Sequence, residues 1–196
     1  MKLIRTVAAT ALLVFALGVG TAQACFYPGA EQVFKPWGDQ HSYVLAPDGG
    51  FEAGGLSWTL RGGAEAVAGN ESYFLNDVLD SGSLSLPAGS SAVSPPICMS
   101  IDTPILRMFA RNTGDPKSRL RIEATYGLLG LVRTTVASNV SAGPKWAPTP
   151  QMSVVLGLST IVGTVLPSAI QVRITPLDAK GSWQVDDFYV DPFARH

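Results

Sequence analysis

The strongest constraint on the fold is a series of short segments in which apolar and polar residues alternate. Between residues 119 and 126 every second residue is apolar, and the residues between them are charged or polar. Residues 169–175 alternate in the same way. Because successive side chains of a β-strand point to opposite faces, each segment places one row against a core and the other in solvent. This pattern is typical of antiparallel sheets.

Ten strand-like segments follow one another, with short connections rich in Gly, Pro, Asn, Asp and Ser. They are residues 57–60, 64–68, 82–86, 92–99, 105–111, 119–126, 131–137, 152–158, 169–175 and 182–190. No segment has a convincing helical period, although the apolar stretch 152–166 has room for a helical turn. No internal repeat divides the 196 residues. The sequence predicts one all-β domain, an antiparallel sandwich or barrel of about ten strands.

Residues 1–24 have the order of a secretory signal peptide. Two basic residues precede the apolar run 7–19, which is too short to cross a bilayer of about 30 Å. We expect cleavage after Ala24, a secreted mature chain that starts at Cys25, and no transmembrane anchor. A lipoprotein is the alternative, but Ala22 and Gln23 do not match the usual lipidation motif.

The two cysteines, Cys25 and Cys98, are most simply one disulfide in an exported protein. Such a bond would tether the N-terminus and stabilise the fold by about 2–4 kcal/mol. A reactive thiol pair is the alternative, and the lack of a C-x-x-C motif disfavours it.

Composition and motifs disfavour two classes of function. Lys and Arg number 14 against 15 Asp and Glu, so no basic surplus exists to bind nucleic acid. The only histidines are His41 and the terminal His196, and no Gly-x-Ser-x-Gly motif is present. Two carboxylates meeting in a cleft stay possible, but no pattern singles out a pair. We therefore expect a non-catalytic protein.

Asp186 and Asp187 are adjacent in the last strand-like segment, so strand alternation turns one of them towards the core or a sheet rim. A buried carboxylate needs a partner, because burying it alone is costly. A hard cation such as calcium is one partner. A salt bridge to an arginine and hydrogen bonds that cap a loop are the others.

Two segments resemble the jelly-roll carbohydrate-binding modules. The opening segment has Gly50-Phe51-Glu52, a Gly-rich turn, Trp58 and the pair Gly63-Ala64, and the closing segment is Val185-Asp186-Asp187-Phe188. The resemblance implies a galactose-binding-like β-sandwich over residues 50–196. It also implies a structural calcium held by Glu52 and by one of Asp186 or Asp187, with the first and last strands side by side.

Residues 25–49 form a lead-in rich in Pro and aromatic residues, which is not part of that module pattern. The chain with this lead-in is similar to a group of secreted bacterial proteins. Whether the lead-in is a strand of the sandwich or an arm around it stays open, and so does the oligomeric state.

Sugar rings stack on exposed aromatic side chains, while their hydroxyls need polar partners. We expect Trp37, Tyr43 and Trp146 to be the stacking residues, whereas Trp58 and Trp183 lie in strand patterns and are expected in the core. Several arginines on neighbouring segments form either an acidic-glycan patch or, the favoured interpretation, solvated faces with acidic partners. They are Arg107, Arg111, Arg119, Arg121 and Arg133.

The expected function is non-catalytic recognition of a polysaccharide or a cell-envelope glycan. The first alternative is a structural or protein-interaction component of the envelope. If all four tryptophans were buried, this alternative would be favoured. The second is a secreted hydrolase that uses His41 or a carboxylate pair.

Overall fold

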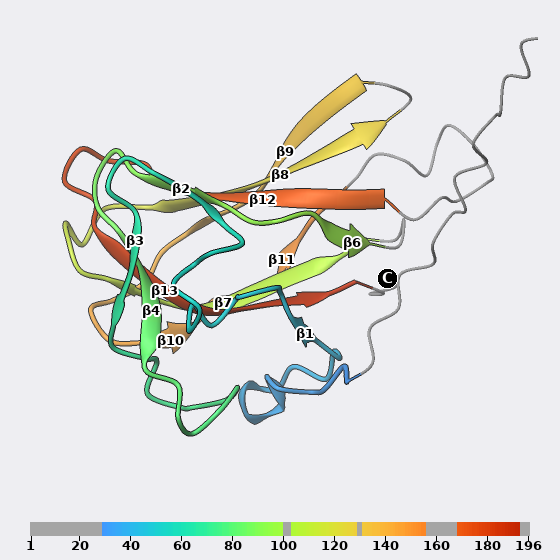
Figure 1. Cartoon of the computed structure of the whole chain (residues 1–196), viewed down its shortest axis with the longest axis horizontal. Helices are drawn as coiled ribbons and strands as arrows, with labels where there is room; N and C mark the ends of the chain where they lie inside the picture. The colour runs from blue at the N-terminus through green and yellow to red at the C-terminus, as the bar shows by residue number, and fades with distance from the viewer. Residues whose placement is uncertain (1–28, 100–102, 129–130, 156–167, 193–196) are drawn as a thin grey trace, which may run out of the picture.

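The computed structural model describes residues 29–99, 103–128, 131–155 and 168–192. These residues form thirteen strands in two antiparallel sheets that pack face to face (Figure 1). The predicted signal peptide and Cys25 lie outside the described residues. No helix within the described part of the chain has the length and hydropathy needed to span a membrane.

The first sheet, called here the covered sheet, has the strand order β10-β7-β13-β4-β3. Two further strands extend it, with β1 beside β13 and β11 beside β7. The bounds are β1 (Val44–Leu45), β3 (Glu65–Ala68), β4 (Gly82–Leu86), β7 (Ile105–Asn112), β10 (Ala147–Pro148), β11 (Met152–Ser153) and β13 (Trp183–Asp191).

The second sheet, called here the open sheet, has the order β2-β5-β12-β8-β9, with β6 also paired to β12. Its strands β8 and β9 form a long hairpin (Figure 1). The bounds are β2 (Thr59–Arg61), β5 (Ser91–Val93), β6 (Ile97–Met99), β8 (Leu120–Leu128), β9 (Leu131–Val140) and β12 (Ser168–Pro176).

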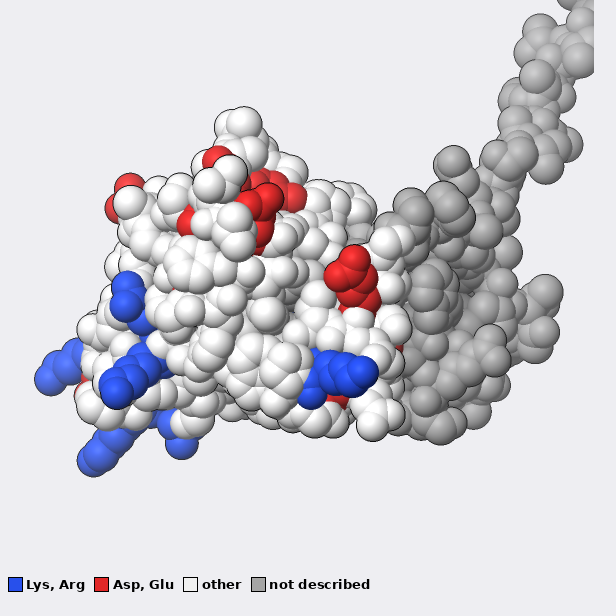
Figure 2. All heavy atoms as spheres, turned by 90° about the horizontal axis from the view of Figure 1, so that it is seen from below, with Lys and Arg blue, Asp and Glu red and all other residues white. Residues whose placement is uncertain are grey.

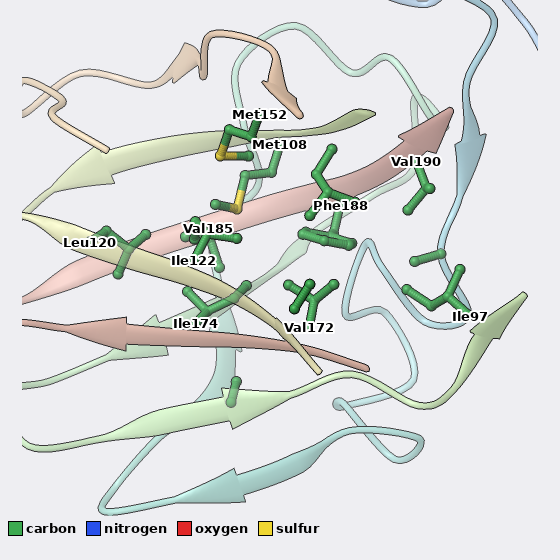
Figure 3. Packing of buried hydrophobic residues seen from close by; sticks show 14 of the residues in the cluster. Ile97, Met108, Leu120, Ile122, Met152, Val172, Ile174, Val185, Phe188 and Val190 are labelled. Carbon is green, nitrogen blue, oxygen red and sulfur yellow. The ribbon is translucent and has the colours of Figure 1, made fainter. Parts of the chain in front are cut away.

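The apolar rows predicted from the alternation meet between the sheets. Ile122 on β8 and Ile174 on β12 face Val185 and Phe188 on β13, with Met108 on β7 beside them (Figure 3). All five side chains are fully buried, so their removal from water contributes to the stability of the sandwich. The predicted all-β antiparallel sandwich of jelly-roll type is confirmed.

Several predicted segments differ in extent from the observed strands. The expected strand over 92–99 is divided into β5 and β6, since Pro95 and Pro96 lie between them and cannot donate to a ladder. The expected strand over 152–158 is reduced to β11, and its last residues lie outside the described part. The two-residue strands β1 and β10 had no alternation long enough to predict them.

A bulge in β13 separates the two adjacent aspartates. The register of β13 against β7 shifts between Asp186 and Tyr189, and Asp187 adopts a left-handed conformation with φ of 49°. Val185 and Phe188 therefore both face the core, while Asp186 and Tyr189 face away from it. At this bulge β13 changes its neighbour from β4 to β1.

The lead-in packs on the outer face of the covered sheet. It contains a 3-10 helix η1 (Lys35–Trp37) and strand β1, and it lies beneath the sheet in Figure 1. Phe34 is fully buried and its ring stacks on Phe109 of β7, with centroids 5.7 Å apart. The lead-in is thus partly a strand and partly an arm, and it supplies a second hydrophobic cluster outside the sandwich.

A buried ion pair fixes the lead-in to this face. The Arg107 guanidinium donates to Asp39 at 2.6 Å and also to the Thr149 carbonyl, and it lies 4.2 Å from the Phe34 ring centroid. Burial raises the pKa of Asp39, but hydrogen bonds from the His41 backbone, Tyr43 and Arg107 outweigh burial and hold this pKa below its usual value. Arg107 therefore does not belong to a surface patch.

Candidate functional site

The outer face of the covered sheet carries a row of side chains that crosses five neighbouring strands. In register, Trp146 precedes β10 and lies beside Arg111 of β7, which is paired with Gln184 of β13. Gln184 is paired with Ser85 of β4, and Ser85 with Glu65 of β3. Strand spacing of about 4.8 Å gives this cross-strand row a length of about 19 Å.

The row combines an aromatic face with planar polar groups. The Arg111 guanidinium lies 4.9 Å from the Trp146 ring centroid, and its Nε donates to the Gln184 side-chain oxygen at 2.6 Å. Trp146, Arg111, Gln184 and Ser85 are half-buried, whereas Glu65 is exposed. Half-buried groups of this kind are held in place by packing and still reach solvent.

Further aromatic rings lie next to the cross-strand row, over Phe109. The centroids of Trp37 and Tyr73 lie 5.6 and 5.3 Å from that of Phe109, and 5.1 Å from each other. Trp37 is half-buried and Tyr73 is 44% exposed. The planes of Trp37 and Tyr73 are nearly perpendicular, at 88°, so the two rings do not form a flat platform.

The tryptophans divide as the sequence predicted, but Tyr43 does not fit its predicted role. Trp58 and Trp183 are buried in the core, while Trp37 and Trp146 keep some exposure. Tyr43 is only 1% exposed and its hydroxyl donates to Asp39 at 2.8 Å. The prediction of Tyr43 as a stacking residue is therefore corrected: the lead-in folds its ring against Phe34, and no face is free for a sugar.

Acidic side chains gather at one edge of this face, and basic side chains gather at the opposite edge (Figure 2). Five acidic residues that lie close enough to shift one another's pKa are called here the acidic region: Glu52, Glu71, Asp80, Asp186 and Asp187. Glu71 and Asp186 are fully buried, and their carboxylate oxygens accept hydrogen bonds. Asp186 accepts from the Glu71 and Asp187 backbone N–H groups, both at 2.8 Å, and Glu71 accepts from the Tyr73 and Leu75 N–H groups. These bonds fix the loop of residues 69–81 on the covered sheet.

Asp187 is the exception, because neither of its carboxylate oxygens accepts a hydrogen bond of good geometry, although the nearby Asn76 backbone N–H lowers its pKa. The residue is 1% exposed. Burial, together with the charges of Glu71 and Asp80, raises the pKa of Asp187 to about 7. Burial also raises the pKa of Asp186 to about 8. An unpartnered buried carboxylate is costly, so this arrangement favours a bound cation or a retained proton.

Asn76 and Asp80 of loop 69–81 lie near Asp187, and the Asn76 amide nitrogen donates to Asp80 Oδ2 at 2.8 Å. A point built where a Cβ on Gly50 would lie is 3.3 Å from Asp187 Oδ1, 3.5 Å from Asn76 Nδ2 and 4.0 Å from Asp80 Oδ2. No three His, Cys, Asp or Glu side chains of the described residues converge as a ready metal site. A cation beside Asp187 would therefore also need amide or backbone oxygens and water, which calcium accepts.

The three carboxylates predicted as calcium ligands have different environments. Glu52 accepts from the backbone N–H groups of Ser81 and Gly82 at 2.8 and 2.5 Å, and its charge raises the pKa of Asp187. Glu52 therefore lies in the same acidic region, but its oxygens are engaged. Asn76 and Asp80 had no signal in the sequence, because only the folding of loop 69–81 brings them to β13.

The structure also places two other residues that the sequence singled out, His41 and Cys98. His41 is half-buried and its Nδ1 lies 3.0 Å from Asp191 Oδ2, with no serine or cysteine hydrogen-bonded to its ring among the described residues. Cys98 is on β6 and is not a free thiol, but Cys25 lies outside the described residues. The Cys25–Cys98 pairing stays a prediction.

A small pocket lies between the lead-in and the acidic region. It has a volume of about 190 Å³, and its lining includes Val33, Tyr43, Leu75 and Tyr189. Glu31 is the one acidic residue among the described residues that line it. The pocket thus does not contain the carboxylate pair that a glycosidase needs.

No protein-family model matches the chain. No curated protein matches it either.

Solved structures match the chain over most of its length. The tandem CBM22-1–CBM22-2 domain of Paenibacillus barcinonensis Xyn10C matches with TM-score 0.52 and 15% identity, over 80% of this chain and 46% of that one. The CBM22-1–GH10 modules of Clostridium thermocellum xylanase Xyn10B, complexed with xylohexaose, match with TM-score 0.50 and 13% identity, over 77% of this chain and 28% of that one.

TmCBM61 in complex with β-1,4-galactotriose matches with TM-score 0.46 and 15% identity, over 76% of this chain and 98% of that one. At these identities the likeness concerns the fold. The predicted resemblance is confirmed at that level: the chain has the jelly-roll β-sandwich fold of carbohydrate-binding modules.

Proposed function

We propose that this chain is a secreted, non-catalytic module that binds a polysaccharide or cell-envelope glycan along the cross-strand row of the covered sheet. The observation that carries the proposal is the succession of Trp146, Arg111 and Gln184 on neighbouring strands. An aromatic face is adjacent there to planar hydrogen-bonding groups, which is the combination that a pyranose ring needs.

The dimensions of the cross-strand row suit a chain of sugars rather than a single sugar. The row extends for about 19 Å at the usual strand spacing, and its side chains are supplied by rigid strands. Trp146 is the stacking residue of the proposal, and Arg111 and Gln184 are the donors to hydroxyl oxygens. Trp37, held over Phe109, flanks the row as a second contact.

A calcium ion beside Asp187 is the second part of the proposal. Asp187 would be the anionic ligand and Asp80 the second carboxylate beside it, while the nearby Asn76 amide nitrogen donates to Asp80 Oδ2 at 2.8 Å and is not a ligand. Bound calcium would neutralise the unpartnered carboxylate. It would also tie the loop at Gly50 and the loop at Asn76 to the bulge of β13, which stabilises the edge of the sheet that carries Glu65 and Ser85.

Export is the third part of the proposal, and it is supported by the sequence order of residues 1–24. Cleavage after Ala24 would leave Cys25 as the first residue of the lead-in. A disulfide with Cys98 on β6 would then connect the lead-in to the open sheet.

Contact with another envelope protein is a second candidate role. Its supporting observation is a set of large apolar side chains in loops at the acidic region, with Leu56 86% exposed and Val78 and Leu79 also exposed. Leu56→Ser and Leu79→Ser variants that lose a partner but keep glycan binding would separate the two roles.

The test is affinity electrophoresis of the exported protein in gels that contain xylan, β-1,4-galactan or mixed-linkage β-glucan. We expect retardation by at least one polysaccharide, and we expect Trp146→Ala or Arg111→Ala to weaken it about fivefold, since one lost contact of this kind is worth about 1 kcal/mol. Arg173→Ala on the open sheet is the matched control. Unchanged retardation of Trp146→Ala and Arg111→Ala would refute the proposed site.

A further inference from the structure

The outer face of the open sheet carries arginines. Leu60 of β2 and Leu120 of β8 contact the core, so alternation turns Arg61, Arg119 and Arg121 outward. The same argument places Arg173 of β12 outward, between the buried Val172 and Ile174. We call these four residues the arginine face. Arg61, Arg119 and Arg173 are exposed and Arg121 is half-buried.

The register brings the arginine face together across the sheet. Arg173 is paired with Glu123 of β8, which makes Arg121 its diagonal neighbour on the adjacent strand, at the usual backbone separation of about 7–8 Å. Arg121 is also paired with Thr175, and Arg61 with Ser91, and these two pairs continue one row across β2, β5, β12 and β8. The arginines therefore line one continuous surface rather than separate loops.

None of the four arginines forms an ion pair within 4 Å among the described residues. The two ion pairs among the described residues, Arg107 with Asp39 and His41 with Asp191, both lie at the covered sheet. Two carboxylates lie beside the arginine face: Glu123 is paired in register with Arg173, and Asp178 accepts from the Arg119 backbone N–H. Arg121 Nε donates to Asn139 Oδ1 at 3.4 Å, so its guanidinium is held at the surface with its other N–H groups turned to solvent. Four arginines so close together repel one another, and an anionic ligand would relieve this repulsion.

We propose that the arginine face binds an anionic polysaccharide whose carboxylate or phosphate groups lie across β12 and β8. Guanidinium groups present paired N–H donors that match carboxylate and phosphate oxygens in a bidentate way. The exposed Gln171 and half-buried Thr125, which are paired across β12 and β8, supply polar groups for sugar hydroxyls. This second site is independent of the cross-strand row on the covered sheet.

The experiment compares polygalacturonate, a teichoic acid and neutral xylan as immobilised ligands for the exported protein at low and high salt. We expect binding to polygalacturonate or teichoic acid, weakened by salt because exposed charges are screened. The better of these two polymers tells whether carboxylate or phosphate is the natural group. Arg121→Ala/Arg173→Ala should bind it at least tenfold more weakly, and the matched control Lys35→Ala/Lys145→Ala should bind it normally.

Two further variants make the test specific to the arginine face. Glu123→Gln removes its one central acid and should tighten polyanion binding, whereas Glu65→Gln on the covered sheet should not. Trp146→Ala should bind polyanions normally, so loss of neutral-glycan binding and loss of polyanion binding are separate results. Equal polyanion binding by wild type and Arg121→Ala/Arg173→Ala, or no binding to either polyanion, would overturn the inference.

Discussion

The two outer faces of this sandwich are built by the same alternation but present opposite chemistry. The covered sheet lies under the aromatic lead-in and loop 69–81, and acidic side chains gather at its edge. The open sheet has no described segment packed on its arginines. The comparison shows that a jelly roll fixes which residues point outward, while the connecting segments decide which outward residues stay available.

The largest expected effect concerns the anchor of the lead-in. Phe34→Ala should lower the free energy of unfolding by about 3–5 kcal/mol, because the ring is fully buried between Arg107 and Phe109. Urea denaturation measures this loss. The exposed Leu56→Ala is the control, with an expected change below about 0.5 kcal/mol. A loss below about 1 kcal/mol for Phe34→Ala would mean that the lead-in is not an integral part of the covered face.

Removal of calcium from the proposed site at the covered sheet should give the next largest loss of stability. Calcium at 100 times its dissociation constant stabilises a folded protein by about 2.7 kcal/mol, so a chelator should lower the melting temperature by several degrees. Asp187→Asn should melt at the same temperature with and without chelator. Glu65→Gln should respond as the wild type does. An unchanged wild-type melting temperature in the presence of the chelator would contradict the proposed calcium site.

The next prediction is the pH dependence of the chelated protein. Burial raises the pKa of Asp187 to about 7 and that of Asp186 to about 8, so the folded chain holds these protons more tightly than the unfolded chain. The resulting stability is complete below about pH 4 and is lost as pH rises towards 8, by at most about 1.4 kcal/mol per pH unit and group.

Asp39 acts in the opposite direction. Its pKa is lowered on folding, so the stability that it contributes is present above about pH 4 and is lost as pH falls further. Thermal melting of the chelated protein should therefore show greatest stability below neutral pH, near pH 4–6. A maximum above pH 7 would contradict the environments described for Asp186 and Asp187.

The alternation of polar and apolar residues was enough to predict the sandwich, because burial of one face is a local property of each strand. It predicted the core positions of Ile122 and Ile174, and also the burial of Trp58 and Trp183. It did not predict the break between β5 and β6 as an interruption, although Pro95 and Pro96 carry that signal.

The contents of the candidate sites were harder to predict, since they depend on contacts between distant segments. Tyr43 and Arg107 are residue types that are often found at protein surfaces, yet the lead-in buries both of them beside Asp39. The bulge that leaves Asp187 without a partner is a backbone feature with no sequence signature. The arginine face could be recognised only from the register of β12 and β8, which makes Arg173 and Arg121 diagonal neighbours. Arg107 and Arg111 lie on β7 of the covered sheet and do not belong to it.

The most direct test of glycan recognition on the covered sheet is an NMR titration of the labelled exported protein with a neutral oligosaccharide, such as xylohexaose or β-1,4-galactotriose. The account predicts shifts at the Trp146 indole N–H and the Arg111 Nε–H, with the side-chain signals of Arg121 and Arg173 unchanged. Shifts confined to the open sheet, or none at Trp146 and Arg111 with any neutral oligosaccharide, would contradict it.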